Sequence, residues 1–245
     1  MELDSDWTIS GHINGGYLMA VMGAAASEVL EGAAPLTISA HFLAPALGGG
    51  PVDVAVEVVR RGRLSTARVA MSRGDTLLVD GFVTTGAPGA SEKVLDNAAL
   101  PDIPPWQDCP DAIERWQGEG MDLLRHLELR PHPVTAAVLS GGPASDEAVM
   151  SAWCRYRDGS AADATLVMAA WDTLPPAPWA AHVWGHLPTV SAQLVLFPGE
   201  FVGPLIIEAR CDTLRDGIAD ETARVWDSTG RLVCSARQTA VLLKG

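Results

Sequence analysis

The chain has 245 residues, of which 48% are hydrophobic, so it can form one large domain or two of ordinary size with a sizeable core. Its 17 lysines and arginines against 30 aspartates and glutamates give a net charge of −13. This balance argues against a general nucleic-acid binder or a protein of anionic membrane surfaces. Because the N-terminus shows no charged segment followed by an apolar one, the sequence predicts a cytoplasmic protein.

The four cysteines lie far apart and form no Cys-x-x-Cys pair. This spacing is typical of reduced, buried thiols, so we expect no disulfide framework. His182 and His186 have the spacing of two ligands on a helix, but the prolines around them disfavour a helix and no acidic or thiol partner is close. The sequence therefore predicts neither a metal site nor a redox cofactor.

The first predicted element is a glycine-rich turn that leads into a helix. Gly15 and Gly16 precede an apolar run that begins at Tyr17, and the helix is predicted to continue to Leu30. A helix that is apolar on all sides is buried inside a protein, and this run is too short for a membrane span, which needs about 20 residues. We expect other elements to surround this helix and Gly32 to mark its end.

An internal repeat organises the strands that follow. Residues 37–41 (Thr-Ile-Ser-Ala-His) recur as residues 189–193 (Thr-Val-Ser-Ala-Gln), an offset of 152 residues. Residues 66–69 (Thr-Ala-Arg-Val) recur identically as residues 222–225, an offset of 156. Because these and other short matches keep their order at nearly the same offset, we interpret the chain as two copies of one fold.

Each copy is predicted to contain one long helix and a set of antiparallel strands joined by glycine-containing turns. We expect the first copy's opening strand to be clipped or very short, and the second copy's helix to cover Ala161–Trp171. The predicted strands are residues 37–43, 52–60, 64–71 and 76–84 in the first copy, and 123–129, 149–156, 194–197, 205–212, 221–226 and 232–242 in the second.

One buried helix surrounded by a long, curved antiparallel sheet is the hotdog arrangement. The sequence therefore predicts an α+β double hotdog, with an N-terminal hotdog at residues 1–86 and a C-terminal hotdog at residues 121–245. Residues 87–120 are rich in proline, glycine and aspartate. We interpret this segment as the inter-domain linker, with a short helix near residues 112–117.

The chain resembles the TesB-like, or type II, double-hotdog acyl-CoA thioesterases over nearly its whole length. The order and spacing of several short motifs carry the resemblance, although none is specific alone. They are residues 14–18 (Asn-Gly-Gly-Tyr-Leu), 42–45 (Phe-Leu-Ala-Pro), 59–63 (Val-Arg-Arg-Gly-Arg), 65–68 (Ser-Thr-Ala-Arg), 225–227 (Val-Trp-Asp) and 235–238 (Ser-Ala-Arg-Gln). The resemblance implies hydrolysis of an acyl thioester, carried by CoA or by acyl carrier protein.

The resemblance also implies three catalytic residues, an Asp, a Thr and a Gln, which activate water. By position these are Asp172 after the second helix, Thr189 at the start of the next strand, and Gln238 in the last strand. In the first copy, the repeat alignment places Ala24, Thr37 and Phe82 at the corresponding positions. Since only the second copy keeps the full polar set, we expect one active site per chain, with catalytic residues from the C-terminal hotdog.

Thioester hydrolysis needs a base and a group that stabilises the oxyanion. We expect burial and the C-terminal end of the second helix to raise the pKa of Asp172. In a side-by-side pair, the first helix can begin opposite this Asp, so the amides of Gly15 and Gly16 are candidate oxyanion donors. The neighbouring residues Asn14 and Tyr17 are further candidates for substrate binding.

Alternative interpretations remain open at each of these positions. Asp172 and Gly15-Gly16 could be ordinary turn residues. Arg60 and Arg63 are candidates for binding CoA phosphates, but charged residues at a hairpin tip are usually only solvated. The fold could also serve a non-catalytic acyl-binding or scaffold protein. A hotdog hydratase would need an Asp–His pair on one short segment, which the sequence does not show. A homo-oligomer is compatible with the sequence.

Overall fold

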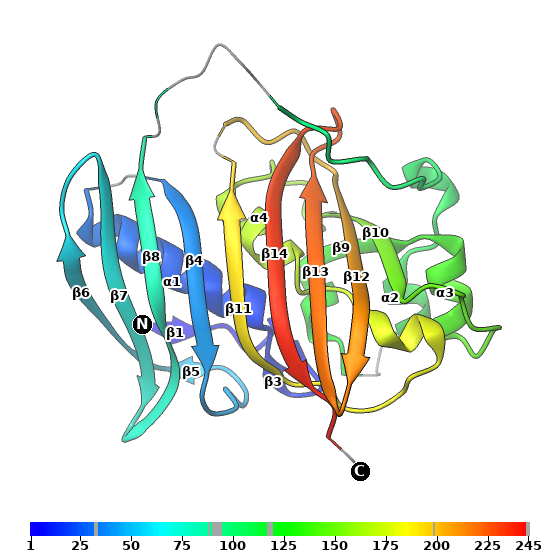
Figure 1. Cartoon of the computed structure of the whole chain (residues 1–245), viewed down its shortest axis with the longest axis horizontal. Helices are drawn as coiled ribbons and strands as arrows, with labels where there is room; N and C mark the ends of the chain where they lie inside the picture. The colour runs from blue at the N-terminus through cyan, green and yellow to red at the C-terminus, as the bar shows by residue number, and fades with distance from the viewer. Residues whose placement is uncertain (32–33, 88, 90–94, 117–119, 198, 244–245) are drawn as a thin grey trace.

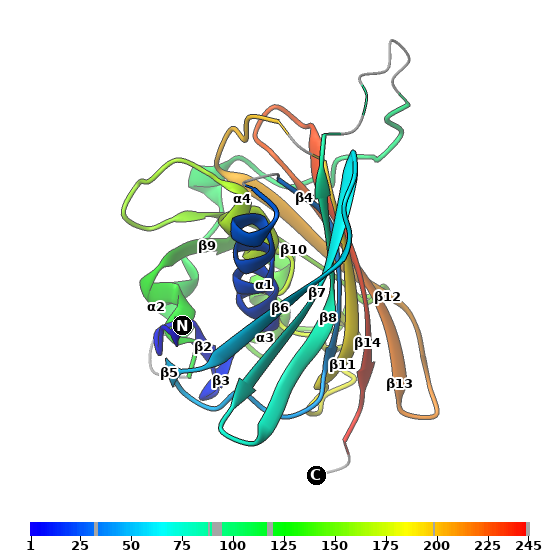
Figure 2. The ribbon, with the colours of Figure 1, turned by 90° about the vertical axis from the view of Figure 1, so that its left-hand side faces the viewer.

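A computed structural model describes residues 1–31, 34–87, 89, 95–116, 120–197 and 199–243. Its main feature is a ten-stranded antiparallel sheet that curves around two helices (Figures 1 and 2). In spatial order the strands are β6 (Asp53–Arg60), β7 (Leu64–Arg73), β8 (Thr76–Gly86), β4 (Pro35–Phe42), β11 (Thr189–Leu196), β14 (Leu232–Val241), β13 (Ile218–Trp226), β12 (Leu205–Arg215), β10 (Val149–Tyr156) and β9 (Leu127–Pro131). The predicted double hotdog is confirmed.

The helices lie on the concave face of this sheet (Figure 2). The long helix α1 (Gly15–Val29) packs against the short helix α4 (Ala164–Ala170). The remaining elements are α2 (Ala112–Trp116), α3 (Pro133–Leu139), the 3-10 helices η1 (Trp106–Asp108), η2 (Asp122–Arg125) and η3 (Ala177–Ala181), and the short strands β1 (Glu2–Leu3), β2 (Thr8–Ile9), β3 (His12–Ile13) and β5 (Gly50–Pro51). No helix of the described residues is long and apolar enough to cross a lipid bilayer.

The start of α1 is fixed by a side-chain cap and by close packing. The Asn14 side chain accepts a hydrogen bond from the amide of Tyr17 at 2.8 Å, which satisfies one of the free amides of the first turn. At the next position, a Cβ atom added to Gly16 would lie 2.6 Å from the carbonyl oxygen of Ala169. Glycine is therefore required where the beginning of α1 meets the end of α4.

The two halves of the sheet join where β4 pairs with β11. Ala40 lies opposite Ala192, with Ser39 opposite Gln193 and His41 opposite Ser191 on either side. Ala40 and Ala192 are equivalent residues at an offset of 152, so a local two-fold axis that relates the two halves passes between them. The register thus confirms the repeat that the sequence indicated for this pair of strands. The domain boundaries at residues 86 and 120 remain a proposal.

The same register corrects the repeat alignment at two places. Gln238 lies opposite Ala192, whereas the residue opposite Ala40 is Gly81, not Phe82. Successive strand residues face opposite sides of a sheet, so an error of one residue moves a side chain to the wrong face. Phe82 indeed points outward and is 48% exposed. Glycine, which has no side chain, therefore stands in the first half where Gln238 stands in the second. The match of residues 66–69 with residues 222–225 is also out of register, because Val69 lies opposite Gly81 as Glu221 lies opposite Gln238. Val69 therefore corresponds to Glu221 and not to Val225.

Two further predictions need correction in the second half. The segment 123–129 is not one strand, because adjacent Leu123 and Leu124 are both buried and form η2 before β9 begins. Helix α4 starts later than Ala161, because the Asp163 side chain caps it by accepting from the amide of Leu166 at 2.8 Å. The predicted stop at Gly32 lies outside the described residues.

Part of the predicted linker is packed on the second half. The Trp153 indole donates a hydrogen bond to the Pro104 carbonyl at 2.9 Å, and Arg130 donates to the Cys109 carbonyl at 3.0 Å. The predicted short helix is present as α2. The first half begins with the two-residue strand β1, which pairs with β5. This agrees with the prediction that the opening strand of the first copy is very short.

We expect Gly16→Ala to lower the free energy of unfolding by about 1–3 kcal/mol, because the added methyl group meets rigid backbone and overpacks the helix contact. For a chain of this size, that change lowers the melting temperature by several degrees. Gly62→Ala is the matched control, since the nearest atom to its added Cβ is 3.7 Å away. Equal melting temperatures of the two variants in thermal unfolding would contradict the close helix contact.

Candidate active site

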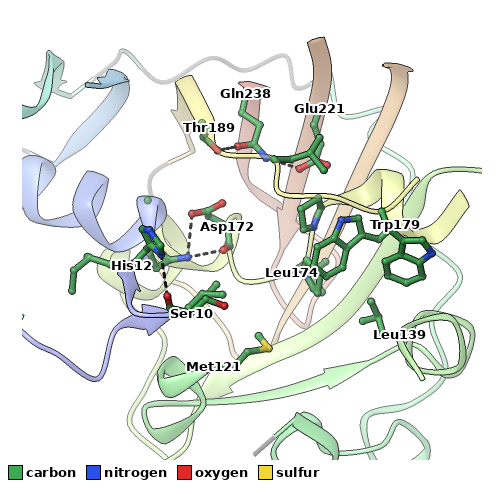
Figure 3. A pocket seen from close by; sticks show the side chains of 18 residues that line it. Ser10, His12, Met121, Leu139, Asp172, Leu174, Trp179, Thr189, Glu221 and Gln238 are labelled. Atoms are coloured by element: carbon green, nitrogen blue, oxygen red, sulfur yellow. Dashed lines mark hydrogen bonds between the residues drawn. The ribbon is translucent and has the colours of Figure 1, made fainter. Parts of the chain in front are cut away.

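A cavity of about 380 Å³ lies between the start of α1, the end of α4, η3 and the inner face of strands β11, β13 and β14 (Figure 3). One side is polar and the rest is mostly apolar and aromatic. The cavity is lined by Ile9, Ser10, His12, Ile13, Asn14, Gly15, Met121, Leu139, Asp172, Leu174, Pro175, Pro176, Trp179, Trp184, Leu187, Thr189, Glu221 and Gln238.

A second cavity, of about 270 Å³, lies beside the first under the segment 42–46. The two cavities share part of their walls, including Asp172 and Thr189. Trp179 lines the larger cavity, whereas Trp171 lines neither cavity, because it is buried in the core. The site is thus a two-armed cavity with polar groups where the arms meet.

Asp172 binds the N-terminus of the opposite hotdog's helix. Its Oδ2 accepts hydrogen bonds from the Gly16 amide and the Asn14 side chain, each at 3.1 Å, and its carbonyl oxygen accepts from the same Asn14 group at 2.6 Å. The sequence prediction that α1 begins opposite Asp172 is therefore confirmed. The structure differs in the use of these donors, because the amide of Gly16 holds the carboxylate itself.

Burial raises the pKa of Asp172 from 3.8 to about 7. The nearby carboxylate of Glu221 contributes to this increase in pKa, whereas hydrogen bonds from the amides of Gly16 and Gly15 oppose it by stabilising the ionised form. The direction of the shift agrees with the sequence prediction, and so does desolvation as its main cause. The sequence had predicted that the amides at the N-terminus of α1 would bind the oxyanion, not the catalytic base.

A second group of polar residues crosses the sheet above Asp172 (Figure 3). The Thr189 hydroxyl donates a hydrogen bond to Oε1 of Gln238. The Gln238 amide nitrogen donates to Oε1 of Glu221 at 2.5 Å, and Oε2 of Glu221 accepts from the Ala177 amide at 2.7 Å. The structure therefore brings Asp172, Thr189 and Gln238 into one cavity and adds Glu221 to them.

Glu221 was not among the site residues predicted from sequence motifs, although the strand pattern contains a signal for it. Along β13 the positions Ala219, Glu221, Ala223 and Val225 are buried in alternation, followed by buried Trp226 at the end of the strand. This is a period of two in which one member is charged. Glutamate is rarely buried without a specific partner. A charged residue on the inward face of a predicted strand is thus a candidate for the site.

Three other predicted substrate-binding residues lie outside the cavities. Tyr17 stacks on Trp7, with ring centroids 4.8 Å apart, and lines neither cavity. Phe42 lines the second cavity, and the pairing of the strands places it level with the start of β6. Arg60 and Arg63 lie at the other end of β6, away from this cavity. A role for these arginines with CoA phosphates stays a prediction that this placement does not support.

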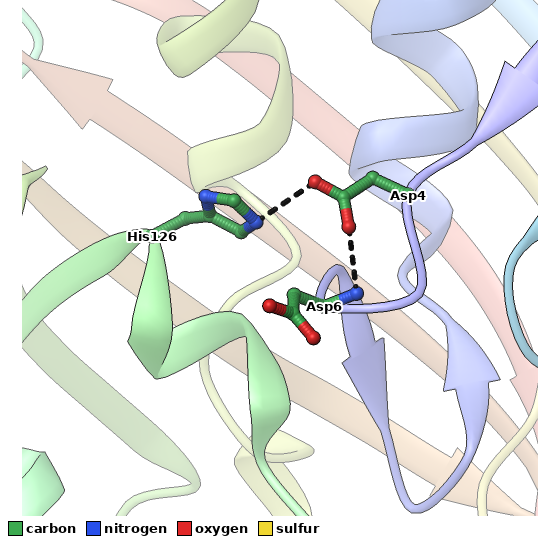
Figure 4. A group of neighbouring side chains, drawn as sticks. All are labelled: Asp4, Asp6 and His126. Carbon is green, nitrogen blue, oxygen red and sulfur yellow. Dashed lines mark hydrogen bonds and ion pairs between the residues drawn. The ribbon is translucent and has the colours of Figure 1, made fainter.

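Asp4, Asp6 and His126 form a cluster outside the cavities (Figure 4). The His126 ring lies 3.0 Å from an Asp4 carboxylate oxygen, and Arg125 forms an ion pair with Asp6 at 2.8 Å. Because the arginine already neutralises one carboxylate, these contacts explain the cluster as a link between the N-terminal segment and η2. They do not require a metal ion.

The fold and the site define a double-hotdog protein with a partly buried carboxylate at the junction of two cavities. The family profile of the acyl-CoA thioesterase N-terminal domain matches residues 3–86, and that of the C-terminal domain matches residues 96–242. The chain therefore belongs to the TesB-like acyl-CoA thioesterase family.

Individual relatives agree with this assignment. The uncharacterized protein Rv0499 of Mycobacterium tuberculosis is 29% identical over 268 residues, covering 98% of this chain and 89% of that protein. The crystal structure of a thioesterase II candidate from Thermobifida fusca is 27% identical, with a TM-score of 0.87 over 100% of this chain and 91% of that one. The acyl-CoA thioesterase II TesB2 of Mycobacterium marinum shares the fold, at 16% identity and a TM-score of 0.69, over 96% of this chain and 90% of that one.

The raised pKa of Asp172 has a consequence for stability. Both the folded and unfolded states bind the proton below about pH 4, but the folded state keeps it up to about pH 7. The free energy of unfolding therefore falls as the pH rises through this window, by on the order of 2–4 kcal/mol. We expect Asp172→Asn to remove the loss, so that the variant gains more stability over the wild type at pH 8 than at pH 5.

Chemical denaturation at the two pH values measures this difference. Asp212→Asn is the control, because the Asp212 side chain is 75% exposed and its replacement should give the same small change at both pH values. A gain for Asp172→Asn that does not depend on pH would contradict the buried, proton-retaining carboxylate.

Proposed function

We propose that the protein hydrolyses acyl-CoA or acyl-carrier-protein thioesters by direct attack of a water molecule that Asp172 activates. The single observation that carries this proposal is the Asp172 carboxylate, which has a pKa of about 7 and lies where two cavities meet. A base with a pKa near neutrality combines a useful ionised fraction with a strong affinity for the proton. Membership of the thioesterase family supports the same chemistry.

The polar groups of the site have separate tasks in this mechanism. Oδ2 of Asp172 is held by Asn14 and Gly16, so we assign Oδ1 to the water. The water oxygen attacks the thioester carbon while its proton passes to Asp172. Collapse of the tetrahedral intermediate breaks the carbon–sulfur bond, and the thiolate takes the proton, which leaves a carboxylic acid and a free thiol. No cofactor is needed for this balance.

The start of α1 would also favour the transition state. Its positive end points at the junction of the cavities, where the negative charge of the oxyanion develops. Because Gly16 already donates to Asp172, we propose that the amides of Gly15 and Gly16 act chiefly by holding the base. Asn14 has the same role, and Thr189 and Gln238 hold the water from the opposite side.

The two cavities suggest separate places for the two parts of the substrate. We assign the acyl group to the larger cavity, whose walls away from Asp172 are formed by apolar residues such as Leu139 and Trp179 (Figure 3). Burial of an acyl chain against such walls supplies about 0.8 kcal/mol per CH₂ group. The thiol-bearing arm would then leave past Phe42 and His186 of the second cavity.

A second candidate, hydration of an enoyl thioester, gains one observation from the structure. His12 lines the same cavity as Asp172, although the sequence shows no Asp–His pair on a single segment. The Nδ1 atom of the His12 ring lies 3.0 Å from the Ser10 carbonyl oxygen, to which it donates in the tautomer that carries a proton on Nδ1. Thiol release distinguishes the candidates, because hydration leaves the thioester intact.

We expect the wild type to release free thiol from at least one member of an acyl-CoA series from two to sixteen carbons. Asp172→Asn should lower kcat by a factor of about 10²–10⁴, as is typical when a general base is removed. Asp212→Asn serves as the control of full activity. Absence of thiol release across the series would refute hydrolysis, and unchanged turnover by Asp172→Asn would refute this site.

The assignment of the acyl cavity leads to a separate prediction. Leu139→Trp should shorten the larger cavity and lower kcat/KM for the longest accepted acyl chains at least tenfold, while short chains react as in the wild type. Leu43→Trp, in the second cavity, is the matched comparison. If Leu43→Trp changes the chain-length profile and Leu139→Trp does not, the two cavities have the opposite roles.

A further inference from the structure

Glu221 is a buried carboxylate that the proposed hydrolysis does not use directly. It is 7% exposed and lies in the wall of the larger cavity. Within the part of the chain that the structure describes, no lysine, arginine or histidine forms a salt bridge with it. Its two oxygens instead accept hydrogen bonds from the Gln238 side chain and the Ala177 amide. Burying a carboxylate without a cation is costly, so its presence calls for a specific role.

The sheet aligns Glu221 with the proposed catalytic residues. Glu221 on β13 lies directly opposite Gln238 on β14, and Gln238 in turn contacts Thr189 on β11, the next strand. All three side chains line the same cavity. A row of hydrogen bonds therefore crosses three strands, from the η3 backbone at one end to the hydroxyl of Thr189 at the other. Figure 3 shows the part of this row from Glu221 to Thr189.

When Glu221 is ionised, the chemistry of this row fixes the direction of every hydrogen bond in it. An ionised carboxylate only accepts, so the end of the Gln238 amide that faces Glu221 is the NH₂ group. The amide oxygen must then face Thr189, whose hydroxyl proton is committed to it. The remaining lone pairs of the Thr189 oxygen are free to accept a proton of the water. Together with Oδ1 of Asp172, they would hold both protons of the water and leave its lone pair for the thioester carbon.

We propose that Glu221 is a positioning residue for hydrolysis, which orients the amide of Gln238 and thereby makes Thr189 a hydrogen-bond acceptor for the attacking water. This inference rests on the proposed function. The Glu221 carboxylate has two separate effects. It sets the direction of the hydrogen bonds in the row, and its negative charge raises the proton affinity of Asp172. Without it, the Gln238 amide can rotate by 180°, so that the Thr189 oxygen accepts from the amide and its hydroxyl donates to the water instead of accepting from it.

The groups that face Glu221 determine how its removal affects the pH profile. Asp172, beyond α4, and Cys211, opposite it on β12, are the described titratable groups that interact with its charge. The pKa values of both are raised by it, because a negative neighbour disfavours a second negative charge. The pKa of Glu221 itself is raised by burial, against the hydrogen bonds from Ala177 and Gln238.

The test compares Glu221→Gln with the wild type in steady-state hydrolysis of the best acyl-CoA substrate. We expect kcat to fall about tenfold with little change in KM, because the water and not the substrate is misplaced. We also expect the acidic limb of the kcat profile to move to lower pH, since the pKa of Asp172 falls when the neighbouring charge is removed. Glu208→Gln, on β12 and outside the cavities, is the matched control and should change neither quantity.

Two more variants separate positioning from a structural role. Glu221→Asp keeps the charge but shortens the side chain, so kcat should fall while the acidic limb stays in place. This variant also provides the test if Glu221→Gln does not fold. If Glu221 acts through Gln238, the double variant Glu221→Gln/Gln238→Ala should be no slower than Gln238→Ala alone.

The outcomes distinguish this inference from the proposed function. A wild type that releases no thiol from any acyl-CoA overturns both. An active wild type that loses activity in Asp172→Asn, but keeps its kcat and its acidic limb in Glu221→Gln, overturns the role of Glu221 alone. Fully additive losses in the double variant would also overturn it, because they would show that Glu221 does not act through Gln238.

Discussion

The contact between the beginning of α1 and the carboxylate of Asp172 links the fold to the site. It joins residues 156 and 158 positions apart in the chain, and it requires α1 and α4 to approach as closely as Gly16 allows. The contact places a negative group at the positive end of a helix, which stabilises it, yet burial still raises its pKa to about 7. The effect of desolvation on the pKa is larger than the opposing effect of the helix N-terminus. The carboxylate therefore has the proton affinity that a general base needs near neutral pH.

The sheet has an equally specific part, because its register decides which side chains reach the cavity. β11, β13 and β14 are neighbours or near neighbours in the second half, and each contributes one polar residue to the same row. These residues lie 32 and 17 positions apart in sequence (Thr189 to Glu221, Glu221 to Gln238). Only the pairing of the strands brings them within hydrogen-bond distance, and a shift of one residue in any strand would turn its polar residue away.

Much of the fold could be predicted from the sequence, because apolar periodicity and the repeat report directly on burial. The approach of α1 to Asp172 followed from placing two copies side by side. What could not be predicted depended on single side chains in three dimensions. Phe82 was aligned with Gln238 although Gly81 occupies that place, because the strand offset drifts by one residue. Glu221 was overlooked because its partners come from β14 and η3. The sequence also did not show that the Gly16 amide donates a hydrogen bond to Asp172.

The asymmetry between the halves has a physical explanation in the cost of buried charge. Asp172 and Glu221 are two carboxylates in one cavity, and each raises the free energy of ionising the other. The equivalents of Gln238 and Glu221 in the first half are Gly81 and, opposite it on β7, Val69, which carry no charge. Only Thr37 is retained, at the position equivalent to Thr189. A second polar row would double this energetic cost, whereas the first half instead supplies the helix terminus that makes the single carboxylate tolerable. The two copies therefore contribute different parts of one site.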